Sequence, residues 1–227
     1  MVGLTLMDLP RELLVKQLGY LAVGDIGSCR CACKGFDAIG DAALASSEHL
    51  CFETNGRIDD EILESISGKF PNLKTLSVAG CKAISSIGVL AMLRSCPRLE
   101  HISLSCAENL DDKVLCCVAS QPFKSLLRTL DLSGGHGLHE FPSPFTDAGI
   151  GAVLRSCFNL VKLDLSFCRG ISDATLADVC KLPFLRDLSI LEDIQFSSQG
   201  IAAAFQHLPE SMESLDVCAV QMDDDGL

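Results

Sequence analysis

The sequence predicts an α/β protein in which a short all-helical hairpin precedes a solenoid of strand–helix repeats. Two periodic patterns predict the solenoid: a six-residue polar block that recurs seven times, and an alternating leucine pattern upstream of the blocks. A separate apolar stripe of helical spacing occupies the first 40 residues. We therefore expect a helical hairpin over residues 4–40, then about six repeats and a partial last repeat over residues 48–227.

The hairpin is predicted from two short helical patterns. Pro10 suits the first turn of a helix, where no bonded N–H is lost, and Leu14, Leu18 and Leu21 then form one apolar stripe. Asp25 suits the cap of a second helix. A helical pair of this size is too small to stand alone, so we expect its remaining apolar surface to be covered.

The polar block marks the start of each predicted repeat helix. It reads apolar, Ser/Thr/Asp, Ser/Asp, any residue, small or branched, aliphatic, and its copies start 25 or 26 residues apart except for one interval of 35. Ser, Thr or Asp at the second position can accept hydrogen bonds from the first turn of a helix. We expect a helix after every copy except the last. The copies begin at Ile58, Ile84, Leu110, Phe145, Ile171, Phe196 and Met222.

Apolar residues follow the blocks at helical spacing and predict the buried helix faces. Two such faces are Ile150, Val153, Leu154, Cys157 and Ile201, Ala204, Phe205, Leu208. Because the last block ends at Leu227, we expect a bare terminal face and self-association of the isolated chain. We expect the loop at residues 134–144, which accounts for most of the long interval, to project from one rim of the array.

Each block follows a strand pattern of the form L-x-x-L-x-L-x-x-C/N. The alternation predicts a strand with one buried face, and Cys or Asn can bury its small side chain where the chain turns. The clearest copies are Leu73, Leu76, Val78, Cys81 and Leu160, Leu163, Leu165, Cys168. Leu50, Phe52 and Asn55 open the array, and weaker copies follow at Leu99, Leu127, Leu185 and Met212.

These residues resemble the cysteine-containing subfamily of leucine-rich repeats over residues 48–227. The resemblance is clearest at Ser95–Leu99 and Ser156–Leu160, which read Ser-Cys-Pro-Arg-Leu and Ser-Cys-Phe-Asn-Leu. Such repeats imply a curved solenoid whose parallel strands line the concave side and whose helices lie on the convex side.

Residues 4–40 resemble the F-box. The matching residues are Leu9, Pro10, Glu12, Leu13, Leu14, Tyr20, Leu21, Asp25, Cys33 and Lys34, whereas Gln17 and Ala32 depart from the pattern. An F-box joined to cysteine-containing repeats is similar to the substrate receptors of Skp-cullin-F-box ubiquitin ligases. The resemblance implies that a Skp-type adaptor binds a set of F-box side chains, namely Leu9, Pro10, Leu13, Leu14 and Ile26.

The same resemblance implies a non-catalytic ligase subunit. The F-box would tether the chain to the adaptor and cullin, the concave face would hold a target protein, and another subunit would deliver ubiquitin for proteasomal degradation. Two alternatives remain open. One is a scaffold or targeting repeat protein without ligase association, and the other is a small-molecule co-receptor of the F-box/leucine-rich-repeat type. The absence of Trp and the single Tyr offer little material for a ligand pocket.

Composition limits the other partners. The 18 basic and 30 acidic residues give a net charge of −12, and no cluster of five basic residues is present, which disfavours nucleic acid. No apolar run of about 18 residues predicts a membrane span, and the first ten residues lack the features of a secretory signal. We expect an intracellular protein, in the cytoplasm, the nucleus or both. The 13 cysteines are odd in number, so we expect reduced thiols.

The outward positions of the predicted strands are the candidates for substrate binding. They are Ser77, His101, Ser103, Asp131, Lys162, Asp164, Asp187 and Ser189. Because Lys162 is their only lasting positive charge, we expect an unmodified or basic target rather than a phosphorylated one. No nucleophile elbow or phosphate-binding loop accompanies them, so we expect no catalytic site. In Cys29-x-Cys31-x-Cys33 the middle thiol of a helix points away from the other two, so we expect neither a metal nor a cofactor.

Overall fold

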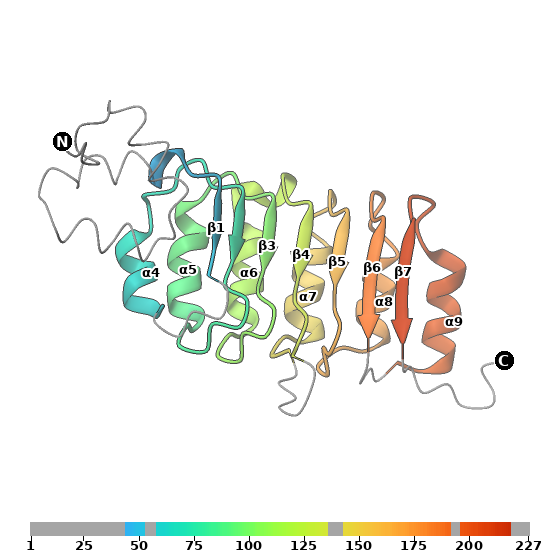
Figure 1. Cartoon of the computed structure of the whole chain (residues 1–227). Coiled ribbons are helices and arrows are strands. Elements are labelled where there is room, and N and C mark those ends of the chain that lie inside the picture. The colour runs from blue at the N-terminus through green and yellow to red at the C-terminus, as the bar shows by residue number, and fades with distance from the viewer. Residues whose placement is uncertain (1–43, 53–57, 136–142, 192–195, 219–227) are drawn as a thin grey trace, which may run out of the picture.

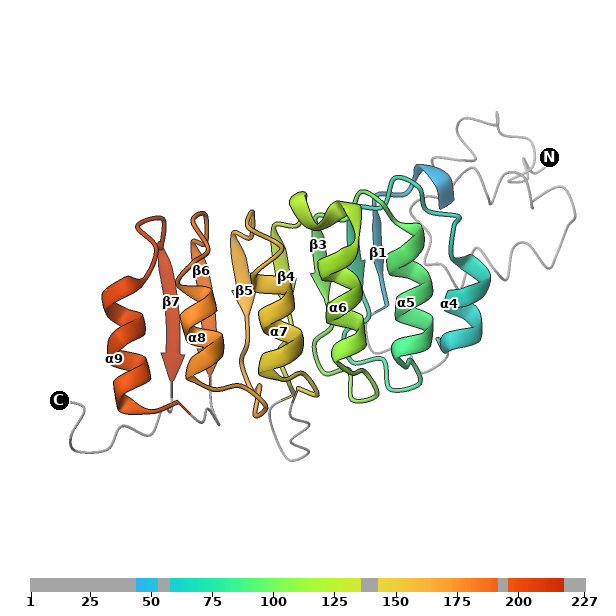
Figure 2. The same cartoon turned by 180° about the vertical axis from the view of Figure 1, so that it is seen from behind.

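The computed structural model describes residues 44–52, 58–135, 143–191 and 196–218. In these residues seven strands alternate with six α-helices. The strands lie side by side on one side of the array and the helices lie on the other (Figure 1), and the view from behind shows the helices in front (Figure 2). The predicted α/β solenoid is confirmed. The hairpin at residues 4–40 and the last block lie outside the described residues, and so does most of the loop at residues 134–144.

The elements follow the predicted order of one strand and one helix per repeat. Their bounds are β1 His49–Cys51, α4 Asp60–Ile66, β2 Thr75–Ser77, α5 Ser86–Ser95, β3 His101–Ser103, α6 Asp112–Ser120, the 3-10 helix η2 Pro122–Ser125, β4 Thr129–Asp131, α7 Asp147–Leu154, β5 Lys162–Asp164, α8 Asp173–Val179, β6 Asp187–Leu191, α9 Ser198–His207 and β7 Ser214–Cys218. The strand pattern did not predict η2, which forms part of the one long repeat.

The strands form a single parallel sheet in sequence order, β1 to β7. The second residue of each strand pairs in register with the second residue of the next. These residues are Leu50, Leu76, Ile102, Leu130, Leu163, Leu188 and Leu215. All but Leu215 are buried. Because side chains alternate along a strand, the first and third residues point to the opposite surface, which we call the strand face.

The buried residues form one continuous cluster from Leu44 to Ile201. Its largest fully buried side chains include Phe70, Phe123 and Phe145. Burial of such a side chain stabilises a fold by roughly 1.5–3 kcal/mol. Since each repeat contributes its own share and packs on its neighbours, the core holds the strand face in a regular register.

All six described helices begin at the residue that the polar block predicts. The N-cap side chain accepts a hydrogen bond from a backbone N–H of the first turn in every case. The N-caps are Asp59, Ser85, Asp111, Thr146, Ser172 and Ser197. Capping of this kind contributes about 1 kcal/mol per helix.

A second hydrogen-bond pattern joins neighbouring repeats. The first residue of each helix pairs with the N-cap of the next helix, and we call the five resulting pairs the rim ladder. They are Asp60–Ser85, Ser86–Asp111, Asp112–Thr146, Asp147–Ser172 and Asp173–Ser197. In every pair a carboxylate meets a hydroxyl. The Ser172 hydroxyl, for example, donates to Asp147 Oδ2 over 2.7 Å.

The rim ladder also sets the size of a third residue. A Cβ at Gly149 would overlap the Oδ1 atom of Asp112. The third residues of α5 and α9 are also glycines, and a Cβ at Gly88 or Gly200 would overlap the carboxylate of Asp60 or Asp173. Such an overlap leaves no room for a side chain. The third residue of α6 is Val114. The preceding helix, α5, begins with Ser86 instead of aspartate, and the smaller serine side chain leaves room for a valine.

Two residues predicted to be buried are exposed. Val217, from the strand pattern that begins at Met212, is 37% accessible. Phe205 was expected on the core face of its helix, but 48% of it is accessible. Ile201 from the same face is buried as expected. Phe205 is exposed because no described element packs beyond α9 and β7. Within the described residues, no helix is long and apolar enough to cross a membrane.

Candidate functional site

The strand face carries two rows of mostly polar side chains. The first residues of the strands form one row, which runs His49, Thr75, His101, Thr129, Lys162, Asp187 and Ser214. The third residues form the other, which runs Cys51, Ser77, Ser103, Asp131, Asp164, Ser189 and Asp216. Adjacent members of a row belong to neighbouring strands, which lie about 4.8 Å apart in a sheet. The surface is therefore a regular grid of hydroxyl, imidazole, carboxylate and ammonium groups.

The centre of this face is hollowed. A cavity of about 330 Å³ lies over β2 to β5. Its lining consists of Thr75, His101, Ile102, Ser103, Thr129, Leu130, Asp131, Lys162 and Asp164. Only two of these residues are aliphatic, and both belong to the buried row of the sheet. The cavity offers polar contacts around a small apolar floor.

The structure brings together five of the eight predicted substrate-binding residues. His101, Ser103, Asp131, Lys162 and Asp164 all line the hollow. The remaining three lie on the same face outside it, and they are Ser77, Asp187 and Ser189. Their role in binding, like that of the five, stays a prediction.

Four lining residues are not among the eight candidates, namely Thr75, Ile102, Thr129 and Leu130. The strand alternation predicts Thr75 and Thr129 as outward positions equivalent to His101, and both lie in the wall of the hollow. Ile102 and Leu130 belong to the buried row, which the alternation does not connect with binding. Ser77, by contrast, is only 9% accessible, so the alternation overstated its exposure. The predicted adaptor-binding residues lie outside the described part of the chain.

Hydrogen bonds fix the carboxylate of Asp131. The Ser103 hydroxyl donates to its Oδ2 atom over 2.9 Å, across the gap between β3 and β4. The backbone N–H and hydroxyl of Ser133 donate to Oδ1 over 3.1 and 2.7 Å. Three donors therefore orient this carboxylate before a partner arrives, which reduces the ordering cost of binding.

The neighbouring carboxylate is less constrained. Asp164 pairs in register with Asp131, and its Oδ1 atom accepts from the backbone N–H of Ser166 over 2.9 Å. Within the described residues, neither carboxylate forms a salt bridge. Lys162 is the only basic side chain that lines the hollow apart from His101, which bonds to the Thr129 hydroxyl over 2.9 Å. The two carboxylates can thus accept from a cationic group of a partner.

The polar groups of the hollow contact one another through hydrogen bonds. The described residues hold no group of three or more His, Cys, Asp or Glu side chains placed to bind a metal ion. In the hollow, the only imidazole is hydrogen-bonded to a threonine rather than to a serine or cysteine nucleophile of the lining. The geometry supports recognition through hydrogen bonds and charge.

One comparison with known proteins, a family match, agrees with this architecture. A sequence model described as a leucine-rich repeat matches residues 156–176, which contain β5 and the start of α8. Two curated relatives are both named antagonist of mitotic exit network protein 1. The protein from Candida glabrata is 25% identical over 151 residues, which are 66% of this chain and 28% of the relative. The protein from Eremothecium gossypii is 26% identical over 144 residues, which are 63% and 35%.

The chain therefore spans 28–35% of the length of these relatives. Among solved structures, leiomodin-1 actin-binding site 2 has a TM-score of 0.49 at 18% identity, over 67% of this chain and 87% of that chain. The family match and the seven in-register parallel strands lead to one conclusion. This chain contains a leucine-rich repeat, in a strand–helix solenoid whose sheet surface is of the kind that binds proteins.

Proposed function

We propose that this chain is a non-catalytic subunit that holds a target protein on its strand face over β2 to β5. The observation that supports this function is the polar hollow of about 330 Å³, in which Asp131 and Asp164 lie side by side and form no salt bridge with any described residue. A protein segment can fill such a hollow while its side chains satisfy the carboxylates. A small apolar ligand would leave them unpaired at a cost.

The target segment carries a basic side chain at the centre of the contact. Arginine suits this position best, because its planar guanidinium can donate to two carboxylate oxygens at once. Asp131 is already oriented by Ser103 and Ser133, so the arriving group needs to order only its own side chain. The net charge of −12 also favours the approach of a basic protein.

The finer role follows from the F-box resemblance of residues 4–40. In this role Leu9, Pro10, Leu13, Leu14 and Ile26 bind a Skp-type adaptor, which links the chain to a cullin. The strand face then holds the target near the ubiquitin-transferring subunit, and the chain itself forms and breaks no bond. The relatives are named antagonists of the mitotic exit network, so proteins of cell-division control are the first targets to test.

Two variants separate the two halves of this proposal. Full-length chain with Leu9→Ala and Pro10→Ala should lose the Skp-type adaptor and cullin in affinity purification but keep its target, because apolar anchors carry most of such an interface. Full-length chain with Asp131→Asn and Asp164→Asn should keep the adaptor and bind the target at least about tenfold more weakly. Asp216→Asn, on the same face outside the hollow and not among the binding candidates, is the matched control.

Each half can fail on its own. If wild-type chain recovers no adaptor or cullin, the scaffold alternative replaces the ligase role. If the Asp131 and Asp164 substitutions weaken target binding no more than Asp216→Asn does, the hollow is not the binding site. Titration with an arginine-containing peptide at two salt concentrations gives a direct measure, since charge-dependent binding weakens as salt rises.

A further inference from the structure

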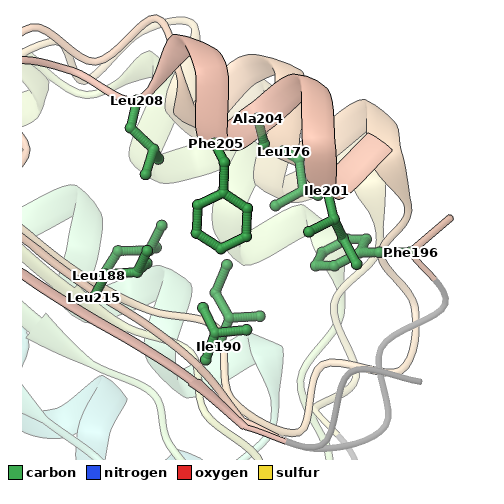
Figure 3. A pocket seen from close by; sticks show the side chains of 10 residues that line it. Leu176, Leu188, Ile190, Phe196, Ile201, Ala204, Phe205, Leu208 and Leu215 are labelled. Atoms are coloured by element: carbon green, nitrogen blue, oxygen red, sulfur yellow. The ribbon is translucent and has the colours of Figure 1, made fainter. Parts of the chain in front are cut away.

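The array ends in an apolar surface that is only partly covered. A pocket of about 30 Å³ lies between α9 and the last two strands, and its lining is entirely hydrophobic. Figure 3 shows Phe205 and Ile201 reaching down from α9 toward Ile190, Leu188 and Leu215. Phe205 is 48% accessible, whereas equivalent faces of earlier helices lie in the continuous core.

One polar group at the same end also lacks a partner. The hydroxyl of Ser198, the first residue of α9, is buried and forms no hydrogen bond within the described residues. The first residue of every earlier helix pairs with the N-cap of the next helix in the rim ladder. The position that should supply the partner of Ser198 is therefore the N-cap of a next repeat.

The rim ladder indicates what that N-cap should be. Where a helix begins with aspartate, the next N-cap is Ser or Thr, and where it begins with serine, the next N-cap is aspartate. Ser86 is the precedent, because its hydroxyl donates to Asp111 Oδ1 over 2.9 Å and the two residues are 25 positions apart. The residue 25 positions after Ser198 is Asp223, the second residue of the last polar block.

We propose that the segment Met222–Leu227 docks on this open end as the first turn of a further repeat. Asp223 accepts from the Ser198 hydroxyl as Asp111 does from Ser86, and Met222 and Leu227 cover the apolar pocket. The segment keeps the repeat spacing, since Met222 follows Phe196 by 26 residues. Gly226 falls on the position that glycine holds in α5, α7 and α9.

A charge-swap cycle in the full-length chain tests this pairing. Ser198→Asp places two carboxylates together at the proposed joint, although aspartate in the first turn would by itself favour the helix. We expect hydrogen exchange of the α9 amides to become about tenfold faster, and Asp223→Ser in the same background to restore the wild-type rate. Asp225→Ser, with the same change of charge two residues away, should not restore it. The same cycle at a pair seen in the structure serves as the reference: Ser86→Asp alone, and then Ser86→Asp together with Asp111→Ser.

Further measurements distinguish the occupants of this end. Because the chain contains no Trp, Phe205→Trp introduces a single tryptophan, which can be excited selectively, at the edge of the pocket. If Met222 covers the pocket, adding Met222→Asp to this variant should increase the quenching of the tryptophan fluorescence by acrylamide. Adding Asp225→Ser should leave the quenching unchanged. Equal hydrogen-exchange rates of the α9 amides in Ser198→Asp and wild type would overturn the proposal. Equal restoration of the wild-type rate by Asp223→Ser and Asp225→Ser would overturn it as well. Protection of α9 that rises with protein concentration would also overturn it, because a second copy would then be the occupant.

Discussion

The hydroxyl of Thr175 donates a 2.5 Å hydrogen bond to the Oδ1 atom of Asp147, although Thr175 is completely buried. Thr175 is the third residue of α8, at the position where α5, α7 and α9 have glycine. Two solutions therefore coexist beside the carboxylates of the rim ladder. Either the third residue has no side chain, or its side chain donates to the carboxylate.

Thr175→Val should test the second solution, because valine keeps the shape of threonine and removes the donor. Loss of this bond leaves an oxygen of the partly buried Asp147 carboxylate without one of its donors, and removal of a buried hydrogen bond typically costs about 1–3 kcal/mol. We expect the urea midpoint of unfolding to fall accordingly. Thr175→Ser, which retains the hydroxyl, should lie closer to wild type, and the reverse order would contradict the role of the bond.

Gly149→Val should test the first solution. Its side chain would meet the carboxylate of Asp112, and overpacking of this kind costs about 1–3 kcal/mol. Asp112→Ser in the same background should recover part of the lost stability. The native chain already has this combination, because Val114 of α6 follows a helix that begins with Ser86. Unfolding free energies of the four chains measure the coupling. Simple additivity of the two single effects would show that the residues do not share this space.

Stability should decrease in acid through two carboxylates of the helices, the partly buried Asp147 and the buried Asp178. Burial alone would raise the pKa of Asp147, but hydrogen bonds from Thr175 and Ser172 outweigh it and hold the pKa below the ordinary value. The pKa of Asp178 is lowered in the same way, because bonds from Lys181 and Arg155 outweigh burial. A carboxylate with a lowered folded pKa stabilises the fold above its unfolded pKa of about 3.9, and this contribution is lost as the pH falls.

We therefore expect the unfolding free energy to fall as the pH decreases below about 4, as measured by urea unfolding. Asp147→Asn should flatten this dependence. Asp187→Asn, at a carboxylate of the strand face, serves as the control for a change of charge alone. An unchanged slope in Asp147→Asn would show that this carboxyl does not contribute.

The buried thiols should resist alkylation. Burial raises the pKa of Cys157 and Cys168 to about 12 and that of Cys96 to about 11, so almost none of these thiols is ionised at pH 8. Among the described cysteines, Cys51 and Cys116 are exposed, and Cys116 should react before the three buried thiols. Mass spectrometry after brief iodoacetamide treatment, with and without urea, measures the order. Equal rates for Cys116 and Cys157 in the folded chain would contradict it.

The leucine periodicity predicted most of the fold because each buried row follows directly from strand alternation. Leu73, Leu76 and Val78 are fully buried, and Ser85 caps its helix, as their spacing required. These features depend on residues close in sequence, so a single chain reveals them. The exposure of Phe205 could not be predicted in this way, because it depends on whether a further repeat packs on α9.

The candidate site was predictable only in part for the same reason. Alternation identified which side chains of β3 face outward, and His101 and Ser103 do line the hollow. It could not locate the edges of the hollow, which depend on the side chains of neighbouring strands 26 or more residues away. The bond from Ser103 to Asp131 is such a contact, since it joins residues 28 positions apart.

The rim ladder also determines which repeats could be deleted or duplicated while each carboxylate at the new junction keeps a hydroxyl partner. Deletion of residues 145–170 would bring Ser172 and Thr175 to the carboxylate of Asp112, and both can donate to it. Deletion of residues 84–109 would instead bring a second carboxylate, Asp111, and a valine to Asp60. The repeats are therefore not interchangeable modules. The array can lose its α7 unit and keep matched neighbours, whereas loss of the α5 unit leaves a joint of like charges.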